Sequence, residues 1–278
     1  NLFITGKAGS GKSTLLEYFR QNTKKNFITL AFQGITAIKA KGQTIHSFFK
    51  FPSHFISQQD IKILKDKDLV NRLDTILIDE ISLVRADLFD AIDVSLKMNR
   101  GNDEPFGGVQ VVVFGDVMQL DPIIGKTDEE IMQKFYPEGV YFFNANCFTE
   151  GNLQNIELTK NFRQKDKSFI DLLNSIRTGS VDEKKLSFLN NRTVTIDDLP
   201  KETIILAPTN RLIYFFNENI SHKKMPTYNT HLKFIESKPY KKWYVVIGIT
   251  KNSSNKKPSS NSRIKIASVY LSKNDEIG

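Results

Sequence analysis

The sequence predicts an α/β fold built on a mostly parallel sheet with helices on both faces. Three observations carry this prediction: short apolar runs typical of strands recur along the chain, stretches with helical spacing lie between them, and a glycine-rich loop follows the first run. The chain has 278 residues, of which 40% are apolar and 25% charged. That length and composition can bury the core of one large or two ordinary domains, and they exclude a disordered or fibrous chain.

The expected elements follow one another in order. Five apolar runs have the length and composition of strands: Leu2 to Thr5, Phe27 to Ala31, Thr75 to Ile78, Val109 to Phe114 and Thr203 to Ala207. After the first run, a helix would bury one face that carries Leu15, Leu16 and Phe19. After the third run, five apolar residues share the spacing of one helix face: Leu83, Leu88, Phe89, Ile92 and Leu96. Near the end, two further strand-like runs, Trp243 to Thr250 and Arg263 to Leu271, flank a polar stretch over 251–262 that we expect to be a loop or a disordered linker.

Positive charge is concentrated in the last part of the chain. The whole sequence carries 39 Lys and Arg against 31 Asp and Glu, a net charge of +8. Residues 221–278 hold 12 basic and 3 acidic residues, net +9, which leaves 27 basic and 28 acidic residues, net −1, in residues 1–220. The overall charge therefore does not by itself predict a nucleic-acid surface on the body of the protein. The basic tail could attract nucleic acid, with Trp243 or Tyr244 available for stacking, or it could be a solvated remnant, and the sequence leaves both readings open.

Cysteine usage and hydropathy exclude several classes of protein. Cys147 is the one cysteine of the sequence and cannot form an internal disulfide, and no apolar run approaches the roughly 18 to 20 residues of a membrane-spanning helix. We therefore expect no membrane partner and an intracellular location, in the cytoplasm of a prokaryote or in the nucleus or mitochondrion of a eukaryote. The four histidines and the cysteine lack the spacing of zinc ligands. Because the chain opens on Asn1 directly before a strand, we expect it to be a piece of a longer protein.

A phosphate-binding loop lies between the first strand-like run and the helical stretch that follows it. The residues read Gly6-Lys7-Ala8-Gly9-Ser10-Gly11-Lys12-Ser13, with Thr14 next, and they fit the P-loop pattern. Glycines let backbone N–H groups turn inward around a β-phosphate, and the helix presents its positive N-terminus. Lys12 would reach the β- and γ-phosphate oxygens, and the Ser13 hydroxyl would ligate Mg²⁺. A glycine-rich turn without a ligand is the alternative, but the strand, loop and helix together favour a nucleoside triphosphate site.

An acidic pair follows the third strand-like run. Asp79 and Glu80 come where a doubly wound sheet gathers its chemistry, at the carboxyl end of a strand. Asp79 would hold Mg²⁺, and Glu80 would polarise the water that attacks the γ-phosphate. Alone, such a pair could equally cap the next helix, but the phosphate loop nearby favours the catalytic reading.

Two further polar side chains could contact the γ-phosphate. Gln119 follows the fourth strand-like run, and its amide can both donate and accept, so it could distinguish a triphosphate from a diphosphate. Arg163 lies in the short motif Asn161-Phe162-Arg163-Gln164 and could neutralise charge that develops during phosphoryl transfer. The alternatives are an exposed turn glutamine and a surface arginine.

An ordered set of motifs in the first 220 residues resembles the petite-integration-frequency (PIF) helicases, superfamily-one enzymes related to the RecD-type helicases. The set consists of GKAGSGKST (6–14), GQTIHSFF (42–49), DEISLVR (79–85), PFGGVQVVVFGD (105–116), Gln119-Leu120 and LTKNFRQ (158–164). The PFGGVQ stretch points to this family over its RecD-type relatives. The resemblance implies a RecA-like first motor domain over residues 1–200 that holds the ATP site, and a partial or divergent start of a second motor domain over 201–278.

The activity that the resemblance implies is ATP-driven movement 5′ to 3′ along single-stranded DNA, with unwinding of duplexes and forks, in repair, recombination and telomere or genome maintenance. ATP and Mg²⁺ are the implied cofactors, and we expect the protein to act on single-stranded and forked DNA as a monomer. In the family, the residues that serve the nucleotide correspond to Gly11, Lys12, Ser13, Asp79, Glu80, Gln119 and Arg163.

The resemblance also implies a DNA contact in the GQTIHSFF motif. The equivalents of Thr44 and His46 lie near the DNA strand, and a hydroxyl and an imidazole can bind phosphates or bases without demanding a sequence. His46 could instead be a structural histidine. Phe48 and Phe49 could stack on bases, but we expect adjacent phenylalanines to belong to the core.

Two rival functions stay open. A truncated or degenerate relative could bind ATP or DNA without unwinding, because residues 221–278 show no match to the late helicase motifs, and Phe32-Gln33 replaces the residues usual in the loop after the second strand. The second rival is a P-loop ATPase that acts as a signalling switch without a DNA partner. The GQTIHSFF motif disfavours it, because that motif has no obvious role in such a switch.

Overall fold

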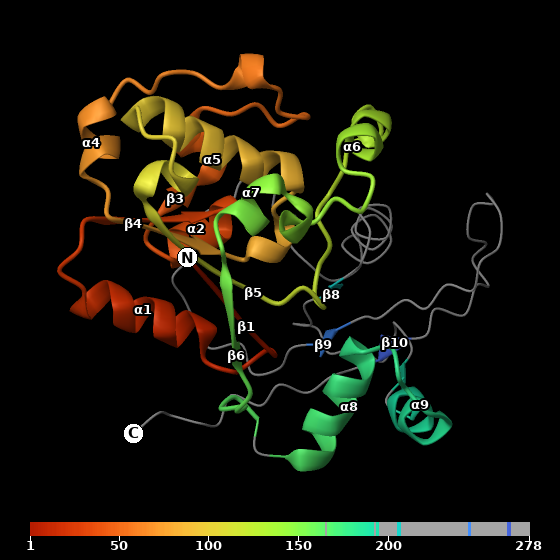
Figure 1. Ribbon diagram of the computed structural model, residues 1–278. Coiled ribbons are helices and arrows are strands. Elements are labelled where there is room, and N and C mark those ends of the chain that lie inside the picture. The colour runs from red at the N-terminus through yellow and green to blue at the C-terminus, as the bar shows by residue number, and fades with distance from the viewer. Residues whose placement is uncertain (165, 192, 195–204, 207–243, 246–265, 268–278) are drawn as a thin grey trace, which may run out of the picture. The chain divides into compact units, whose positions relative to one another are not determined.

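The computed structural model describes residues 1–164, 166–191, 193–194, 205–206, 244–245 and 266–267 (Figure 1). The chain forms two compact units, Asn1–Gly179 and Ser180–Gly278. No helix in the described part of the chain is long and apolar enough to cross a membrane.

A six-stranded parallel sheet forms the centre of the first unit. Its strands are β1 (Leu2–Gly6), β2 (Phe27–Ala31), β3 (Gln43–Thr44), β4 (Thr75–Asp79), β5 (Gln110–Gly115) and β6 (Gln154–Leu158), in the spatial order β3-β2-β4-β5-β1-β6. Every neighbouring pair is parallel. The predicted fold class is therefore confirmed. The sequence pattern missed β3, which has two residues, and β6, an edge strand whose side chains are mostly exposed and which lacks a continuous apolar run.

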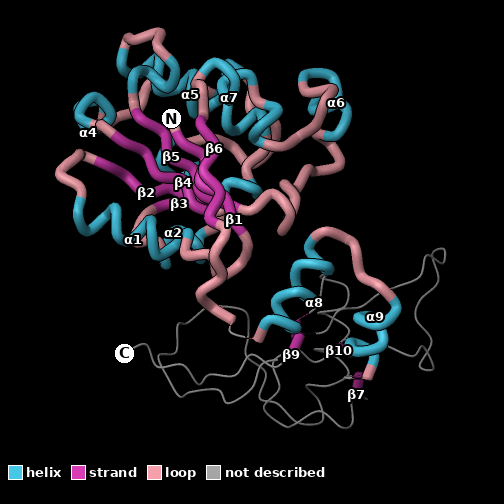
Figure 2. Tube along the Cα trace, turned by 60° about the horizontal axis from the view of Figure 1, so that its bottom comes forward, coloured by secondary structure: helices cyan, strands magenta, loops and turns pink. Residues whose placement is uncertain are grey.

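Helices cover both faces of this sheet, as Figure 2 shows for α1 and α2 on one face and α5 and α7 on the other. The α-helices of the unit are α1 (Lys12–Asn22), α2 (Gly34–Lys39), α3 (Ile45–Phe49), α4 (Lys67–Arg72), α5 (Ala86–Arg100), α6 (Glu129–Phe135), α7 (Asn146–Glu150) and α8 (Lys167–Arg177). Four short 3₁₀ turns separate them: η1 (Gln58–Asp60), η2 (Ile81–Leu83), η3 (Pro105–Gly108) and η4 (Phe142–Asn144).

The larger core lies between the sheet and α5. Four of the five apolar residues predicted to share a helix face do so, since Leu88, Phe89, Ile92 and Leu96 are all buried in α5. Each such side chain contributes about 1.5–3 kcal/mol when it is fully removed from water. The prediction was wrong for Leu83, which is buried but lies in η2, because the chain turns through this 3₁₀ segment before α5 begins at Ala86.

The smaller core lies between the sheet and α1. Leu16 is buried there and Phe19 packs against it, as expected. The prediction that Leu15 shares this face was wrong, because its side chain is 37% exposed. Adjacent helical residues point about 100° apart, so the face that directs Leu16 and Phe19 to the sheet directs Leu15 to solvent.

The PFGGVQ stretch forms a buried turn before β5. Phe106 takes a left-handed backbone conformation (φ 56°) and its N–H donates to Asp93 Oδ1 at 2.6 Å. Its ring lies against Phe89 of α5, with centroids 5.5 Å apart. This motif precedes β5, so it anchors the sheet to α5 and does not contribute to the edge at which the carboxyl ends of the strands lie.

The second unit is described only in part. It contains α9 (Glu183–Asn190), capped by Asp182, whose side chain accepts from the Lys185 N–H at 2.7 Å. Two short pairings follow: β7 (Thr193–Val194) with β10 (Ile266–Ala267), antiparallel, and β8 (Ile205–Leu206) with β9 (Tyr244–Val245), parallel. The polar stretch 251–262 and most of the basic tail lie outside the described residues. The domain boundary expected near residue 200 stays a prediction.

Candidate functional site

The predicted site residues gather along the carboxyl edge of the sheet. Because all six strands are parallel, their carboxyl ends lie at one edge. The segments that follow β1, β4, β5 and β6 carry the phosphate loop, the acidic pair, Gln119 and the Arg163 motif, and β3 ends at Thr44. The strand order places β5 between β4 and β1, so these four segments are neighbours on the sheet.

The phosphate loop makes a tight turn that favours glycine at two positions. Gly9 and Gly11 have left-handed φ angles of 81° and 94°. A Cβ at Gly9 would lie 2.6 Å from the Cβ of Arg163, so the loop after β6 packs directly on this turn. Helix α1 begins at Lys12 with Gly11 as its N-cap, which directs the N-terminus of the helix toward the loop.

The Lys12 side chain is held over the loop. Its Nζ donates to the carbonyl of Gly6 at 2.5 Å and to that of Lys7 at 3.3 Å. Burial lowers the pKa of Lys12, while the carboxylates of Asp116, Glu80 and Asp79 oppose that shift. Three carboxylates thus lie within electrostatic range of one amine. This is the convergence of lysine and acidic pair that the sequence predicts.

The acidic pair is half-buried and electrostatically strained. Asp79 ends β4, and its Oδ1 accepts the Glu80 N–H at 3.0 Å. Burial raises the pKa of Asp79, and burial together with the neighbouring Asp79 and Asp116 raises that of Glu80. A bound cation would relieve this unfavourable concentration of negative charge.

Glu80 also has a strained backbone. Its φ of 54° lies in the left-handed region, which costs a non-glycine residue on the order of 1–3 kcal/mol. The next residue, Ile81, is fully buried, and a Cβ at Gly115 of β5 would lie only 2.7 Å from its side chain. Close packing under the acidic pair therefore fixes the turn at Glu80. Strain of this kind is common at active sites.

Asp116 is a buried acid at the end of β5 that the sequence analysis left without a role. Its side chain is 0% exposed and accepts hydrogen bonds from three groups. Arg177, the last residue of α8, donates from its guanidinium at 2.7–3.2 Å. Gln119 donates from Nε2 at 3.1 Å and the Met118 N–H at 3.2 Å. Gln119 itself is exposed, so its side chain can reach a ligand.

Asn161 fastens the Arg163 motif to the phosphate loop. Its side-chain amide donates to the carbonyl of Ala8 at 3.1 Å, and its Oδ1 accepts the Arg163 N–H at 3.0 Å. The Phe162 N–H donates to the carbonyl of Gly9 at 2.8 Å. The motif is therefore bonded through its backbone to the loop, while the Arg163 side chain is exposed. This places Arg163 beside the phosphate loop, as its predicted role requires.

The loop offers polar groups that suit a phosphate and a hard cation. The Ser10 hydroxyl is buried and makes no hydrogen bond to any residue in the described part of the chain. Ser13 and Thr14, by contrast, are exposed at the start of α1. The described residues contain no group of three or more His, Cys, Asp or Glu side chains able to hold a metal. Ser13 and Asp79 could supply the one or two protein oxygens that Mg²⁺ takes when water and phosphate complete its coordination.

Thr44 and His46 lie at the other end of the carboxyl edge. The Thr44 hydroxyl caps α3 by accepting the Ser47 N–H at 3.1 Å. The His46 ring packs edge-on against Phe32 with centroids 5.6 Å apart, and burial and the Arg85 charge lower its pKa. Both side chains are half-buried, so they keep some surface for a ligand.

Phe48 and Phe49 belong to the core. Their side chains are 9% and 1% exposed, and their rings contact one another with centroids 4.7 Å apart. This confirms the expectation that they are not stacking platforms.

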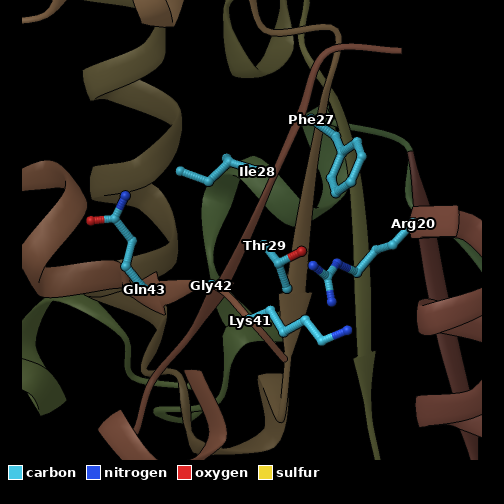
Figure 3. Close-up of a pocket in the computed structure, with 7 residues that line it drawn as sticks. All are labelled: Arg20, Phe27, Ile28, Thr29, Lys41, Gly42 and Gln43. Carbon is cyan, nitrogen blue, oxygen red and sulfur yellow. The ribbon is translucent and has the colours of Figure 1, made fainter. Parts of the chain in front are cut away.

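A separate cavity of about 380 Å³ lies between α1, β2 and β3. Figure 3 shows the residues that line it: Arg20, Phe27, Ile28, Thr29, Lys41, Gly42 and Gln43. None of the predicted site residues is among them. Glu17 pairs with both cationic groups that line the cavity, Arg20 at 2.9 Å and Lys41 at 3.4 Å, so one of the two positive charges is compensated.

Sequence reasoning missed three residues that organise the site: Asp116, Asn161 and Arg177. The first two stood within motifs already recognised, and an Asn in a loop is a signal for a turn in which its side chain accepts the backbone N–H two residues on. Arg177 had no such signal beyond being a basic residue near a helix end, which is common.

Comparison with known proteins gives a consistent result. The family model described as PIF1-like helicase matches residues 1–187. Among curated proteins, the ATP-dependent DNA helicase RRM3 of Saccharomyces cerevisiae is 35% identical over 207 residues, which cover 71% of this chain and 28% of that protein.

Solved structures of Pif1 helicases have the same fold. A structure of two coordinating Pif1 helicases at forked double-stranded DNA is 41% identical with a TM-score of 0.72, covering 78% of this chain and 52% of that one. Pif1 helicase from Bacteroides in complex with ADP-AlF3 and single-stranded DNA is 39% identical with a TM-score of 0.72, covering 81% and 53%. The chain therefore spans about half the length of these proteins, and less of the yeast relative.

Proposed function

Because the chain belongs to the PIF1-like helicase family, we propose that it contains the nucleotide-hydrolysing motor domain of an ATP-dependent DNA helicase. The observation that carries this proposal is the position of Lys12, held over the phosphate loop within electrostatic range of Asp79, Glu80 and Asp116. A loop of this shape that only bound an anion would not need a strained, half-buried acidic pair beside it.

Each residue has a defined role in the proposed reaction. The loop N–H groups and Lys12 bind the β- and γ-phosphates, and the N-terminus of α1 adds its positive end. Glu80 accepts a hydrogen bond from the attacking water and orients it toward the γ-phosphorus. Gln119 and Arg163 contact the γ-phosphate, where Arg163 neutralises charge in the transition state.

Mg²⁺ fits the oxygen groups at this edge. The Ser13 hydroxyl and the Asp79 carboxylate are the residues that would hold it, and the raised pKa of Asp79, caused chiefly by burial, is the condition that a nearby cation would reverse. When bound, the ion would neutralise charge on the phosphate oxygens. Asp79 would then be ionised and fixed as a ligand.

DNA binding is proposed for the β3 end of the carboxyl edge, at Thr44 and His46. The relatives support single-stranded and forked DNA as the partner, because a Pif1 helicase is solved with each of them. Movement 5′ to 3′ and roles in repair, recombination and telomere maintenance rest on the family resemblance. Monomeric action on DNA stays a prediction, since two Pif1 helicases coordinate in the fork structure.

The test of this function is ATP hydrolysis by the purified chain with and without single-stranded DNA. We expect DNA to raise the rate, and a forked duplex to be separated only when ATP is present. A Lys12→Ala variant controls for a contaminating ATPase. A chain that neither binds nor hydrolyses ATP would contradict the proposal.

A second candidate is a relative that binds ATP and DNA without unwinding. The observation that favours it is Phe32, which replaces the residue usual in the family in the loop after β2 and packs against His46, one of the two proposed DNA contacts. DNA-stimulated hydrolysis without strand separation would support this candidate over the complete motor.

A further inference from the structure

The side chain of Asp116 connects two parts of the first unit that are far apart in sequence. Arg177 approaches it in a forked arrangement, with Nε 3.2 Å and 3.0 Å from the two carboxylate oxygens and a terminal nitrogen 2.7 Å from Oδ1. The carboxylate is 0% exposed, and 21% of the Arg177 side chain is exposed. A forked Arg–carboxylate contact fixes direction as well as distance.

The same carboxylate also binds Gln119, through the oxygen that the Arg177 Nε contacts at 3.0 Å. Gln119 Nε2 donates to Oδ2 at 3.1 Å. A carboxylate can only accept hydrogen bonds, so it requires the nitrogen of the amide, and not the oxygen, to face it. The second N–H of the amide and its Oε1 are then left for a ligand. An N–H suits a γ-phosphate oxygen, and Oε1 suits a water.

This orientation requires an ionised Asp116. Burial by itself would raise the pKa of Asp116, but hydrogen bonds from Arg177, Met118 and Gln119 outweigh it, and the pKa is lowered. Without Arg177, a buried carboxyl near Glu80 would tend to take up a proton. A protonated carboxyl can donate, and it would allow the Gln119 amide to turn over.

We propose that Arg177 is a positioning residue that orients the Gln119 amide through Asp116, and so allows the nucleotide site to distinguish a triphosphate from a diphosphate. The inference rests on the proposed function, because it needs a nucleotide at the phosphate loop. Arg177 is also the last residue of α8 and precedes the second unit by three residues. The Asp116–Arg177 contact therefore connects Gln119, the proposed γ-phosphate contact, to the segment that leads into the second unit.

The test is the ratio of the dissociation constants for ADP and for a non-hydrolysable ATP analogue, measured with Mg²⁺ on the full 278-residue chain. Wild type should prefer the triphosphate. We expect Arg177→Gln to reduce this preference about 10-fold or more, because a charge-assisted contact is lost, and we expect Gln119→Ala to reduce it by a similar factor. Arg177→Lys keeps the positive charge but loses the forked contact. Its preference for the triphosphate should lie between those of wild type and Arg177→Gln.

The double variant separates an action through Gln119 from a general effect. If Arg177 acts through the amide, Arg177→Gln should change nothing further in a Gln119→Ala background. The inference would be overturned if the two substitutions each reduced the triphosphate preference independently, so that their factors multiplied in the double variant. It would also be overturned if Arg177→Gln kept the wild-type preference. Failure of the proposed function is distinguishable, because the wild type itself would then bind no nucleotide.

Two further variants separate positioning from folding. Arg177→Gln combined with Asp116→Asn removes the buried charge, so the temperature of unfolding should recover while the nucleotide preference does not. If the temperature of unfolding and the nucleotide preference both recovered, the Asp116–Arg177 contact would have only a structural role, and the inference would be overturned. Arg100→Gln is the matched control, since Arg100 ends α5 and bonds backbone carbonyls, including that of Gly107 at 2.7 Å. It should lower stability and leave the preference unchanged.

Discussion

The two ends of the carboxyl edge have opposite chemistry. At the end formed by β4, β5 and β1, the side chains are charged, and Asp79, Glu80, Asp116 and Arg177 all lie within electrostatic range of Lys12. At the β2 and β3 end, the half-buried side chains of Thr44, His46 and Phe32 present a hydroxyl, an imidazole and an aromatic ring. Burial and a nearby arginine lower the pKa of that imidazole, so it is neutral at physiological pH.

The boundary between the two ends is a single strand. Ala31 of β2 pairs with Asp79 of β4 on one side and with Thr44 of β3 on the other. At ordinary strand spacing, the Cα atoms of Asp79 and Thr44 are therefore about 10 Å apart. The difference teaches that one edge can hold two kinds of partner. We expect the fixed charges to select a metal-bound triphosphate, and the neutral groups to bind a DNA strand without selecting its sequence.

The largest expected effect is at the charged end. Lys12→Ala should abolish ATP hydrolysis, with a fall in kcat/KM of about 100-fold or more, because the cation that meets the β- and γ-phosphates is lost. DNA binding without nucleotide should be unchanged if the two ends are independent. Steady-state hydrolysis and a DNA titration measure the two properties, with exposed Lys24→Ala as the matched control. Wild-type hydrolysis in Lys12→Ala would contradict the assignment.

The second effect separates turnover from binding within the charged end. Glu80→Gln should retain ATP binding and lose about 100-fold or more in kcat, because an amide cannot accept a proton from the attacking water. Single-turnover hydrolysis and a nucleotide titration distinguish the two steps. Glu17→Gln, on α1 outside the edge, is the control. Unchanged turnover in Glu80→Gln would refute the assigned base.

The third effect is at the neutral end. His46→Ala should weaken binding of single-stranded DNA about 5- to 10-fold, within the range for one stacking or hydrogen-bonding contact, and leave ATP binding unchanged. Because the imidazole is neutral, the dependence of DNA affinity on salt should keep its slope. Exposed His54→Ala is the control. A weaker dependence of DNA affinity on salt in His46→Ala would show that His46 binds DNA as a charged group, which would contradict the difference between the two ends.

The smallest effect concerns stability and pH. The pKa of Asp116 in the folded chain is below its ordinary value, so its contribution is present above about pH 4 and is lost as pH falls through the folded value. The difference in unfolding free energy between wild type and Asp116→Asn, on the order of 1 kcal/mol at pH 7, should therefore shrink on acidification. Urea unfolding at pH 7 and pH 3 measures it. A difference that grows toward low pH would contradict the sign.

Much of the fold was predictable from the sequence because its signals are local. The strands β1, β2, β4 and β5 are continuous apolar runs, and the phosphate loop and the acidic pair follow two of them directly. A parallel sheet then places these residues at one edge without further information. The edge strands β3 and β6 were missed for the same reason, since neither is a continuous apolar run.

The sequence by itself determined the chemistry at this edge: a phosphate loop, two carboxylates, a glutamine and an arginine. Only the tertiary structure decided how they are held. The Asp116–Arg177 contact spans 61 residues and the Asn161–Ala8 contact 153, and the left-handed turn at Glu80 is set by packing of Ile81 against Gly115. Such partners are chosen by the packing of distant elements, and no spacing along the chain encodes them.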